Sequence, residues 1–234
     1  MPEPLVIAVA QPMCTPCDVA ANALTHASTV REAGARVVVF PELSLTGYEL
    51  DAPALGVDDP RLGPLVEACA EVGSLALVGA PVEGDAGRAH IAMLAVDGTG
   101  VTVAYRKVWL GGTEPDRFAP GDAPAVLEVD GWRLGLAICK DTGIPQHASD
   151  TAALGIDAYV AGVLESEEDA AVPGDRARRV AADHGVWVAI ASFAGSTGGG
   201  YDRAAGGSGI WGPDGVAVAL AGPETGAIAS GKLG

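Results

Sequence analysis

Short apolar runs separated by turns and by longer amphipathic stretches form the pattern of this chain. The apolar runs are rich in Val, Ile, Leu and Ala, which is typical of buried strands. They lie at 5–11, 36–40, 74–81, 91–96, 101–109, 125–129, 133–139, 157–164, 186–192, 208–211 and 216–220. The amphipathic stretches predict helices at 18–34, 60–72, 146–154 and 173–184. Asp18 and Gly34 are typical residues for the two ends of the first helix.

The order of these elements predicts two α/β halves. Strands and helices alternate up to residue 81, which implies parallel strands with right-handed crossovers. Hairpin turns are expected at 97–100, Asp-Gly-Thr-Gly, and at 213–215, Pro-Asp-Gly. Two such halves predict an α/β fold of two mixed β-sheets packed face to face with helices outside, a four-layer αββα sandwich forming one domain over 1–234. The glycine-dense segment 195–207 is expected to form a mobile rim.

Charge and hydropathy restrict the partners. The formal net charge is −16, so nucleic acid and anionic membrane surfaces would repel the protein. No apolar run approaches the ~20 residues that a membrane helix needs. The first four residues, Met-Pro-Glu-Pro, lack the basic region of a signal peptide. We therefore expect a cytoplasmic protein without a nucleic acid or membrane partner.

The chain contains four cysteines, of which three invite structural interpretations. Cys14 and Cys17 have the spacing of a redox or zinc half-site, but no pair of histidines is spaced to complete a zinc site. A redox dithiol and a loop with two incidental thiols both remain open. Cys69 is expected on the apolar face of the helix at 60–72.

Cys139 is the fourth cysteine, and it ends the buried strand 133–139. The carboxyl end of a strand is where open α/β sheets bind their ligands, although a free cysteine is more often a core residue. Glu42 follows the strand at 36–40, and Lys107 lies near the end of the run at 101–109. Charged residues at strand ends are more often solvent-exposed tips.

A carboxylate, an ammonium and a thiol can together perform acyl transfer. In that hypothesis Glu42 takes the thiol proton, Cys139 attacks a carbonyl or nitrile carbon, and Lys107 stabilises the oxyanion. The backbone N–H of Lys140 would be a second oxyanion donor. A Cys–His protease pairing with His147 or His184 is the alternative, but neither histidine lies in a protease signature.

Three separated segments resemble the motifs of the nitrilase superfamily, the carbon–nitrogen hydrolases. Residues 40–48, Phe-Pro-Glu-Leu-Ser-Leu-Thr-Gly-Tyr, resemble the glutamate motif. Residues 105–110, Tyr-Arg-Lys-Val-Trp-Leu, resemble the lysine motif, and 135–141, Gly-Leu-Ala-Ile-Cys-Lys-Asp, the cysteine motif. The resemblance covers nearly the whole chain. It implies an αββα fold that forms a homodimer through its helices, or a higher homo-oligomer. It also implies a Glu–Lys–Cys catalytic set, no metal or organic cofactor, and a small-molecule amide as substrate.

The resemblance also implies further site residues. A second family glutamate after the lysine motif falls on Glu114, which would orient Lys107, with Asp116 as a competing position. Tyr48, Lys140 and Asp141 are expected to contact the oxyanion or the substrate.

The chain departs from the family pattern around the nucleophile. Lys140 stands where amidases usually carry an aromatic residue, while Asp141 fits the amidase branch rather than true nitrilases. The segment 144–149 lacks the usual Glu and Arg, and 192–193 lack the usual Asn. Lys140 could contact a substrate carboxylate or lower the pKa of the thiol, or it could pair with a neighbouring acid such as Asp141.

These observations predict an amide hydrolase of the amidase-like branch. A small linear amide or N-carbamoyl compound would form a thioester on Cys139, which water then hydrolyses with release of ammonia or amine. Two alternatives stay open: an acyltransferase of the same superfamily, and a non-catalytic relative that binds a metabolite.

Overall fold

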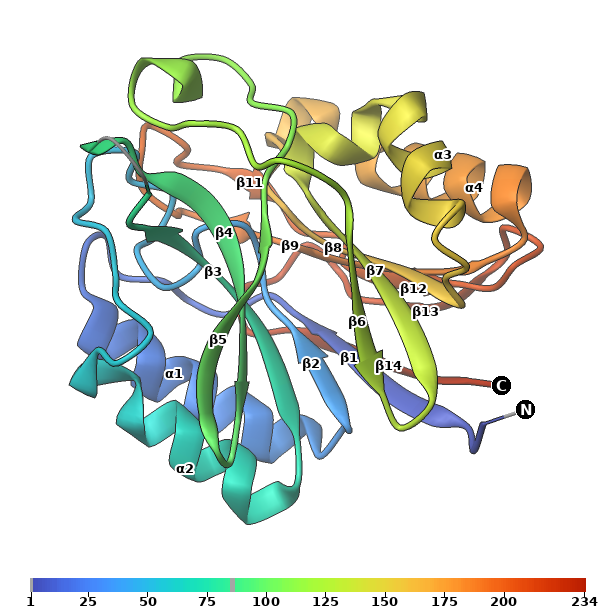
Figure 1. The fold of residues 1–234 in the computed structure, drawn as a ribbon, viewed down its shortest axis with the longest axis horizontal. Helices are drawn as coiled ribbons and strands as arrows, with labels where there is room; N and C mark the ends of the chain where they lie inside the picture. Colours follow the sequence, from blue (N-terminus) through green and yellow to red (C-terminus); the bar gives the residue numbers. More distant parts are fainter. Residues whose placement is uncertain (1, 85–86) are drawn as a thin grey trace.

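Two six-stranded β-sheets face each other in this protein (Figure 1). The computed structural model describes residues 2–84 and 87–234. Strands of the first sheet follow the order β14 (Ile228–Leu233), β1 (Leu5–Ala10), β2 (Val37–Val39), β3 (Leu75–Val82), β4 (His90–Asp97), β5 (Gly100–Arg106). Those of the second follow the order β13 (Ala217–Leu220), β12 (Gly209–Trp211), β9 (Trp187–Ser192), β8 (Ala158–Val163), β7 (Trp132–Ile138), β6 (Ala125–Val129).

Both sheets are mixed, as the sequence predicts. In the first sheet β1, β2 and β3 are parallel, and β4 and β5 continue it as an antiparallel hairpin. In the second sheet β7, β8 and β9 are parallel, with antiparallel neighbours on both sides. The sequence did not predict β14, which pairs antiparallel with β1. Its residues, Ile-Ala-Ser-Gly-Lys-Leu, mix small and polar side chains and lack the apolar run of the other strands.

Helices cover the outer faces of both sheets (Figure 1). Helices α1 (Val19–Ala33) and α2 (Gly63–Val72) lie on the first sheet, and α3 (Pro145–Ala152) and α4 (Val172–His184) on the second. Asp18 caps α1 by accepting from the Ala21 N–H, and Gly34 ends it with a φ of 54°. A 3₁₀ turn at Pro60–Leu62 precedes α2, where the sequence predicts one continuous helix. The four-layer αββα sandwich is confirmed.

Most of the core lies in three apolar layers, one between the two sheets and one between each sheet and its helices. Strand residues that face the other sheet form the central layer, such as Ile7 and Val39 from one side and Leu136 and Val160 from the other. The alternate residues, such as Val38, face the helices instead. Because the central strands are buried on both faces, they appear in the sequence as continuous apolar runs. No helix in the described part of the chain is long and apolar enough to cross a membrane.

Two of the strands that end earlier than the sequence predicts carry residues of the candidate site. Strand β5 ends at Arg106, so Lys107 is the first residue after the strand. Strand β7 ends at Ile138, and Cys139 begins a 3₁₀ helix, η4 (Cys139–Gly143). Segment 195–207 contains a short ribbon, β10 (Ala194–Gly195) with β11 (Ala204–Ala205).

Candidate active site

Glu42 lies in a turn after β2 that two glycines from different sheets clamp. A Cβ added to Gly79 of β3 would lie 2.2 Å from the Leu43 nitrogen. A Cβ added to Gly162 of β8 would lie 2.5 Å from the carbonyl oxygen of Phe40. Leu43 itself has a φ of 52°, a backbone conformation that residues other than glycine rarely adopt. The packing of both sheets therefore fixes the buried Glu42 carboxylate.

Lys107 links two buried carboxylates. Its Nζ donates to Glu42 Oε1 at 2.6 Å and to Glu114 Oε1 at 2.7 Å. All three side chains are at most 3% exposed, so little water competes for these ion pairs. Buried ion pairs need complete hydrogen bonding to offset the loss of hydration, and here the ammonium is shared between two acceptors.

Glu114 is in turn held by groups on either side of it. Its Oε1 accepts from the Tyr48 hydroxyl at 2.9 Å, and its Oε2 accepts from the Gly111 N–H at 2.7 Å. The competing position, Asp116, is exposed. The structure thus brings together Glu114, rather than Asp116, with the lysine and the tyrosine named from the sequence.

Cys139 occupies a strained position at the start of η4. Its φ of 42° lies in the left-handed region, where a residue with a side chain persists only if its surroundings hold it. The thiol donates to the Leu164 carbonyl at 3.5 Å, and Cys139 and Glu42 lie close enough to affect each other's pKa. Within the described residues, Glu42 Oε2 is buried without a hydrogen-bond partner. That oxygen is free to accept the thiol proton.

Burial sets the protonation states of this group. It raises the pKa of Glu42 to about 7, with Lys107 opposing the rise and Glu114 adding to it. Burial also raises the pKa of Cys139, and the nearby Glu42 raises it further. Burial opposes the charge of Lys107, but the surrounding acids outweigh it and raise the lysine pKa. The resting site therefore holds a thiol, a charged lysine and a carboxylate that titrates near neutrality.

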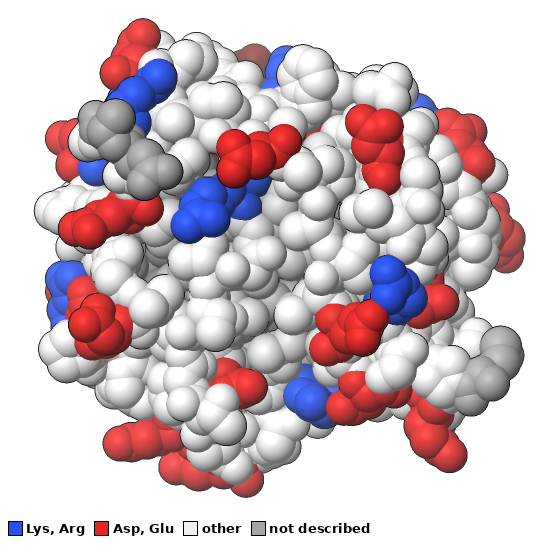
Figure 2. Space-filling model, viewed as in Figure 1, with Lys and Arg blue, Asp and Glu red and all other residues white. Residues whose placement is uncertain are grey.

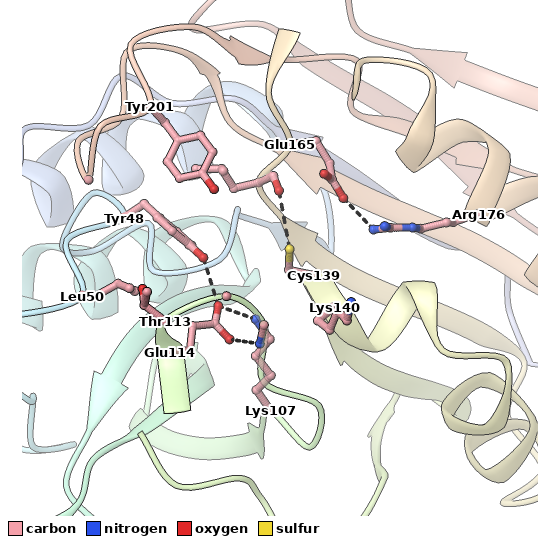
Figure 3. A pocket seen from close by; sticks show the side chains of 14 residues that line it. Tyr48, Leu50, Lys107, Thr113, Glu114, Cys139, Lys140, Glu165, Arg176 and Tyr201 are labelled. Carbon is pink, nitrogen blue, oxygen red and sulfur yellow. Dashed lines mark hydrogen bonds and ion pairs between the residues drawn. The ribbon is translucent and has the colours of Figure 1, made fainter. Parts of the chain in front are cut away.

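Lys107, Glu114 and Cys139 line a pocket of about 480 Å³, whereas Glu42 lies behind them and is not part of its lining (Figure 3). Its lining includes Tyr48, Leu50, Lys107, Thr113, Glu114, Cys139, Lys140, Leu164, Glu165, Arg176 and Tyr201. Glu165 and Arg176 are the charged lining residues that the sequence analysis does not name as site residues. They form an ion pair of 2.6 Å at the pocket wall. Glu165 lies just after the end of β8, as Glu42 lies just after the end of β2. The same strand-end position could therefore have identified Glu165 from the sequence.

The segment 195–207 forms part of the pocket rim. Gly199 and Tyr201 line the pocket, and the Tyr201 ring contacts the Tyr48 ring edge-on with centroids 5.3 Å apart. The Gly199 N–H donates to Glu49 Oε1 at 2.9 Å. The rim position agrees with the sequence analysis, whereas movement of the segment stays a prediction.

Asp141 does not line the pocket. Its carboxylate is fully buried and accepts from the N–H groups of Ile138 and Trp109 and from the Tyr105 hydroxyl, at 2.7–2.9 Å. It therefore ties η4 to the lysine segment and has no free oxygen for Lys140 or for a substrate. The side chain of Lys140 lies against Gly111 and lines the pocket instead. A Lys140–Asp141 pair, one of the sequence-based alternatives, is not formed.

The other cysteines and the histidines lie outside this pocket. Both ring nitrogens of His147 are bonded to tyrosines, Tyr105 and Tyr159, at 2.9 Å, so this ring does not pair with Cys139. Cys14 donates to the Ser44 carbonyl, and burial raises its pKa to about 12, which is opposite to the low pKa of a redox thiol. Cys69 is buried on α2, as expected.

Comparison with known proteins identifies the family. The family model of the carbon–nitrogen hydrolases matches residues 6–233. The chain belongs to the carbon–nitrogen hydrolase family. It is 30% identical to a Pseudomonas protegens protein described as "Hydrolase in pqqF 5'region", over 88% of this chain and 75% of that protein. It is also 29% identical to an (R)-stereoselective amidase of a Pseudomonas species, over 53% of this chain and 46% of the amidase.

Solved structures agree with this assignment. An amidase of the nitrilase superfamily from Nesterenkonia superposes with a TM-score of 0.88 at 25% identity, over 98% of this chain and 90% of that structure. A variant of the same amidase shows the result of Michael addition of acrylamide at its active-site cysteine. The family predicted from the three motifs, and its amidase-like branch, are confirmed for this carbon–nitrogen hydrolase.

Proposed function

We propose that this carbon–nitrogen hydrolase is an amidase in which Cys139 is the nucleophile, Glu42 the general base and Lys107 the oxyanion-stabilising cation. One observation carries the proposal. The Lys107 ammonium bridges Glu42 and Glu114 at 2.6 and 2.7 Å, beside a strained cysteine at a pocket. A protein that only binds a metabolite gains nothing from a buried base, cation and thiol arranged in this way.

The first half of the reaction forms a thioester. The pKa of Cys139 is raised, so its proton must leave during attack, and the unpartnered Glu42 Oε2 is placed to take it. The negative charge that develops on the amide oxygen is stabilised by Lys107 and by the N–H of Lys140. The first N–H groups of a helix have no acceptor within it, so the start of η4 supplies this donor. Glu42 then protonates the leaving ammonia or amine.

The second half hydrolyses the thioester. Glu42, ionised again, removes a proton from water as the water attacks the acyl carbon. The tetrahedral intermediate then collapses, the C–S bond breaks to release the carboxylic acid, and Glu42 returns the proton to the Cys139 thiolate. The Glu42 pKa of about 7 suits both roles, because a group that titrates near the working pH can accept and return a proton. Glu114 and Tyr48 keep the Lys107 ammonium aimed at the same point in both halves.

A small amide is the substrate that this site suits. A pocket of about 480 Å³ admits a short acyl chain. An acyltransferase, in which an amine or another acceptor replaces water, remains the alternative. A cytoplasmic location, a homodimer and a single domain over 1–234 stay predictions from the sequence.

The test uses Cys139→Ala with Cys69→Ala as its matched control, since Cys69 is buried on α2 away from the pocket. Each protein is incubated with short aliphatic amides and N-carbamoyl amino acids, and released ammonia and intact mass are followed. We expect ammonia and an acyl adduct with the native protein and with Cys69→Ala, and neither with Cys139→Ala. Turnover by a folded Cys139→Ala protein would disprove the assignment. Transfer to hydroxylamine faster than hydrolysis would favour the acyltransferase.

A further inference from the structure

Two basic side chains share one side of the pocket with no catalytic role in the scheme above. In Figure 3, Lys140 and Arg176 lie on one side of Cys139, and Tyr48 and Glu114 lie on the other. The protein as a whole is acidic, with a net charge of −16, and acidic side chains predominate on the face shown in Figure 2. Two cations beside Cys139 are therefore unusual in a molecule whose net charge is strongly negative.

Arg176 is held in place by its neighbours. Its Nη1 donates to Glu165 Oε1 at 2.6 Å and to the Thr142 hydroxyl at 3.4 Å. The guanidinium lies over Gly143, where an added Cβ would be 3.3 Å from the Arg176 Cζ. Within residues 2–84 and 87–234, Nη2 and Nε of Arg176 have no hydrogen-bond acceptor. The bonds of Nη1 thus orient the Arg176 side chain, while Nη2 and Nε remain available to donate to a ligand.

Lys140 supplies a second positive charge on the same side of the pocket as Arg176. No carboxylate in the part of the chain that the structure describes lies within ion-pair distance of its ammonium. Burial raises the pKa of Glu165, and Arg176 and Lys140 both oppose that rise, which places the lysine within electrostatic reach of Glu165. The wall therefore carries two positive charges and one negative charge, and the negative charge is already paired with Arg176.

We propose that Lys140 and Arg176 bind a carboxylate at the far end of the substrate's acyl chain, so that the preferred substrate is a monoamide of a short dicarboxylic acid. This inference rests on the proposed amidase function and names its substrate class. Carboxylates are bound best by charge-assisted hydrogen bonds, which a guanidinium and an ammonium both provide. Lys140 follows Cys139 directly, with Cα atoms ~3.8 Å apart, so the carboxylate lies only a few bonds from the attacked carbon.

Three amides of similar length and different charge test the proposal. Succinamate carries a carboxylate, levulinamide replaces it with a neutral acetyl group, and 4-aminobutanamide carries an ammonium. For the native protein we expect kcat/KM for succinamate to exceed that for levulinamide by about 10- to 100-fold, which is the range of charge-assisted hydrogen bonds. The cationic amide is expected to be the poorest substrate.

Variants assign the preference to individual side chains. Lys140→Met and Arg176→Met are each expected to lower the succinamate-to-levulinamide ratio at least about tenfold, mainly through KM. Lys232→Met is the matched control, because Lys232 is exposed on β14 and does not line the pocket. Glu165→Gln removes the one acid of this wall and is expected to raise the ratio.

A second readout does not depend on turnover. Iodoacetate and iodoacetamide alkylate the same thiol but differ in charge, and peptide mapping reports the rate at Cys139. The anion-to-neutral rate ratio is expected to fall in Lys140→Met and to stay unchanged in Lys232→Met. If no amide releases ammonia while this alkylation ratio behaves as expected, the amidase proposal fails and the anion site stands. Equal ratios in native and variant proteins, or a preference for 4-aminobutanamide, would overturn the anion site.

Discussion

Glu114→Gln is a sharp test of how the buried charges control the reaction. Glutamine has nearly the shape of glutamate and keeps one oxygen that can accept from Lys107 and from the Tyr48 hydroxyl, but its amide nitrogen cannot accept from the Gly111 N–H. The substitution removes one negative charge that raises the pKa of Glu42. We therefore expect the pKa of Glu42 to fall in this variant.

The size of the shift follows from the geometry. Both carboxylates bond to one ammonium nitrogen, at 2.6 and 2.7 Å, which places them close to each other. With charge centres roughly 6 Å apart and an effective dielectric constant of about 20, their repulsion is about 3 kcal/mol, equivalent to about 2 pH units. Relaxation and entering water reduce this value, so we expect a shift of about 1 to 2 units.

The assay is the pH dependence of kcat/KM for ammonia release. Glu42 acts as a base only when ionised, so the rate rises as the pH passes upward through its pKa, near 7 in the native protein. A lower pKa moves this acid limb to lower pH in Glu114→Gln. The maximal rate is expected to fall as well, because the glutamine holds the Lys107 ammonium less firmly than a carboxylate does.

Tyr48→Phe is the matched control. It removes a hydrogen bond to Glu114 without removing a charge, so its acid limb should stay within a few tenths of a pH unit of the native one, whatever happens to the rate. An acid limb that stays in place or moves to higher pH in Glu114→Gln would refute the assignment of that limb to Glu42.

Two further substitutions test the supports of the site. Gly162→Ala would push a Cβ to within 2.5 Å of the Phe40 carbonyl, so we expect urea unfolding to show a loss of about 1 to 3 kcal/mol together with lower activity. An unchanged unfolding midpoint would contradict the clamp. Asp141→Asn replaces a buried acceptor of three hydrogen bonds, and we expect thermal unfolding to show a loss of about 1 to 3 kcal/mol. Full stability with full activity would show that Asp141 does not support the site.

The residues to which we assign the chemistry were predictable because they follow apolar runs. Glu42 and Cys139 come directly after buried strands, and Lys107 follows β5 in the structure, so one rule about strand ends brings three separated residues to one edge. The same rule applies to Glu165 after β8. It was overlooked because no motif marks that segment.

Other features depend on three-dimensional packing that no local pattern encodes. Arg176 reaches the pocket from α4, and only the folded chain shows that Gly143 leaves room for its guanidinium. Asp141 lies two residues after the nucleophile, but the 3₁₀ turn of η4 directs its carboxylate to the backbone of Ile138 and Trp109. The sequence places a residue near a site far more readily than it gives the direction of the side chain.

The two sheets supply different groups of the candidate site. The first sheet and its loops supply Glu42, Lys107 and Glu114, whereas the second supplies Cys139 and the side chains of Lys140 and Arg176. After burial, Lys107, Glu114 and Cys139 are the groups with the largest effects on the pKa of Glu42. Charge selectivity and the acid limb should therefore vary separately. We expect Lys140→Met to lower the succinamate-to-levulinamide ratio of kcat/KM without moving the acid limb of the pH profile. Glu114→Gln is expected to move the acid limb without changing that ratio. The double variant is expected to show both changes in full. A double variant with only one of the changes would mean that the two sets of charges are coupled, since independent sites add.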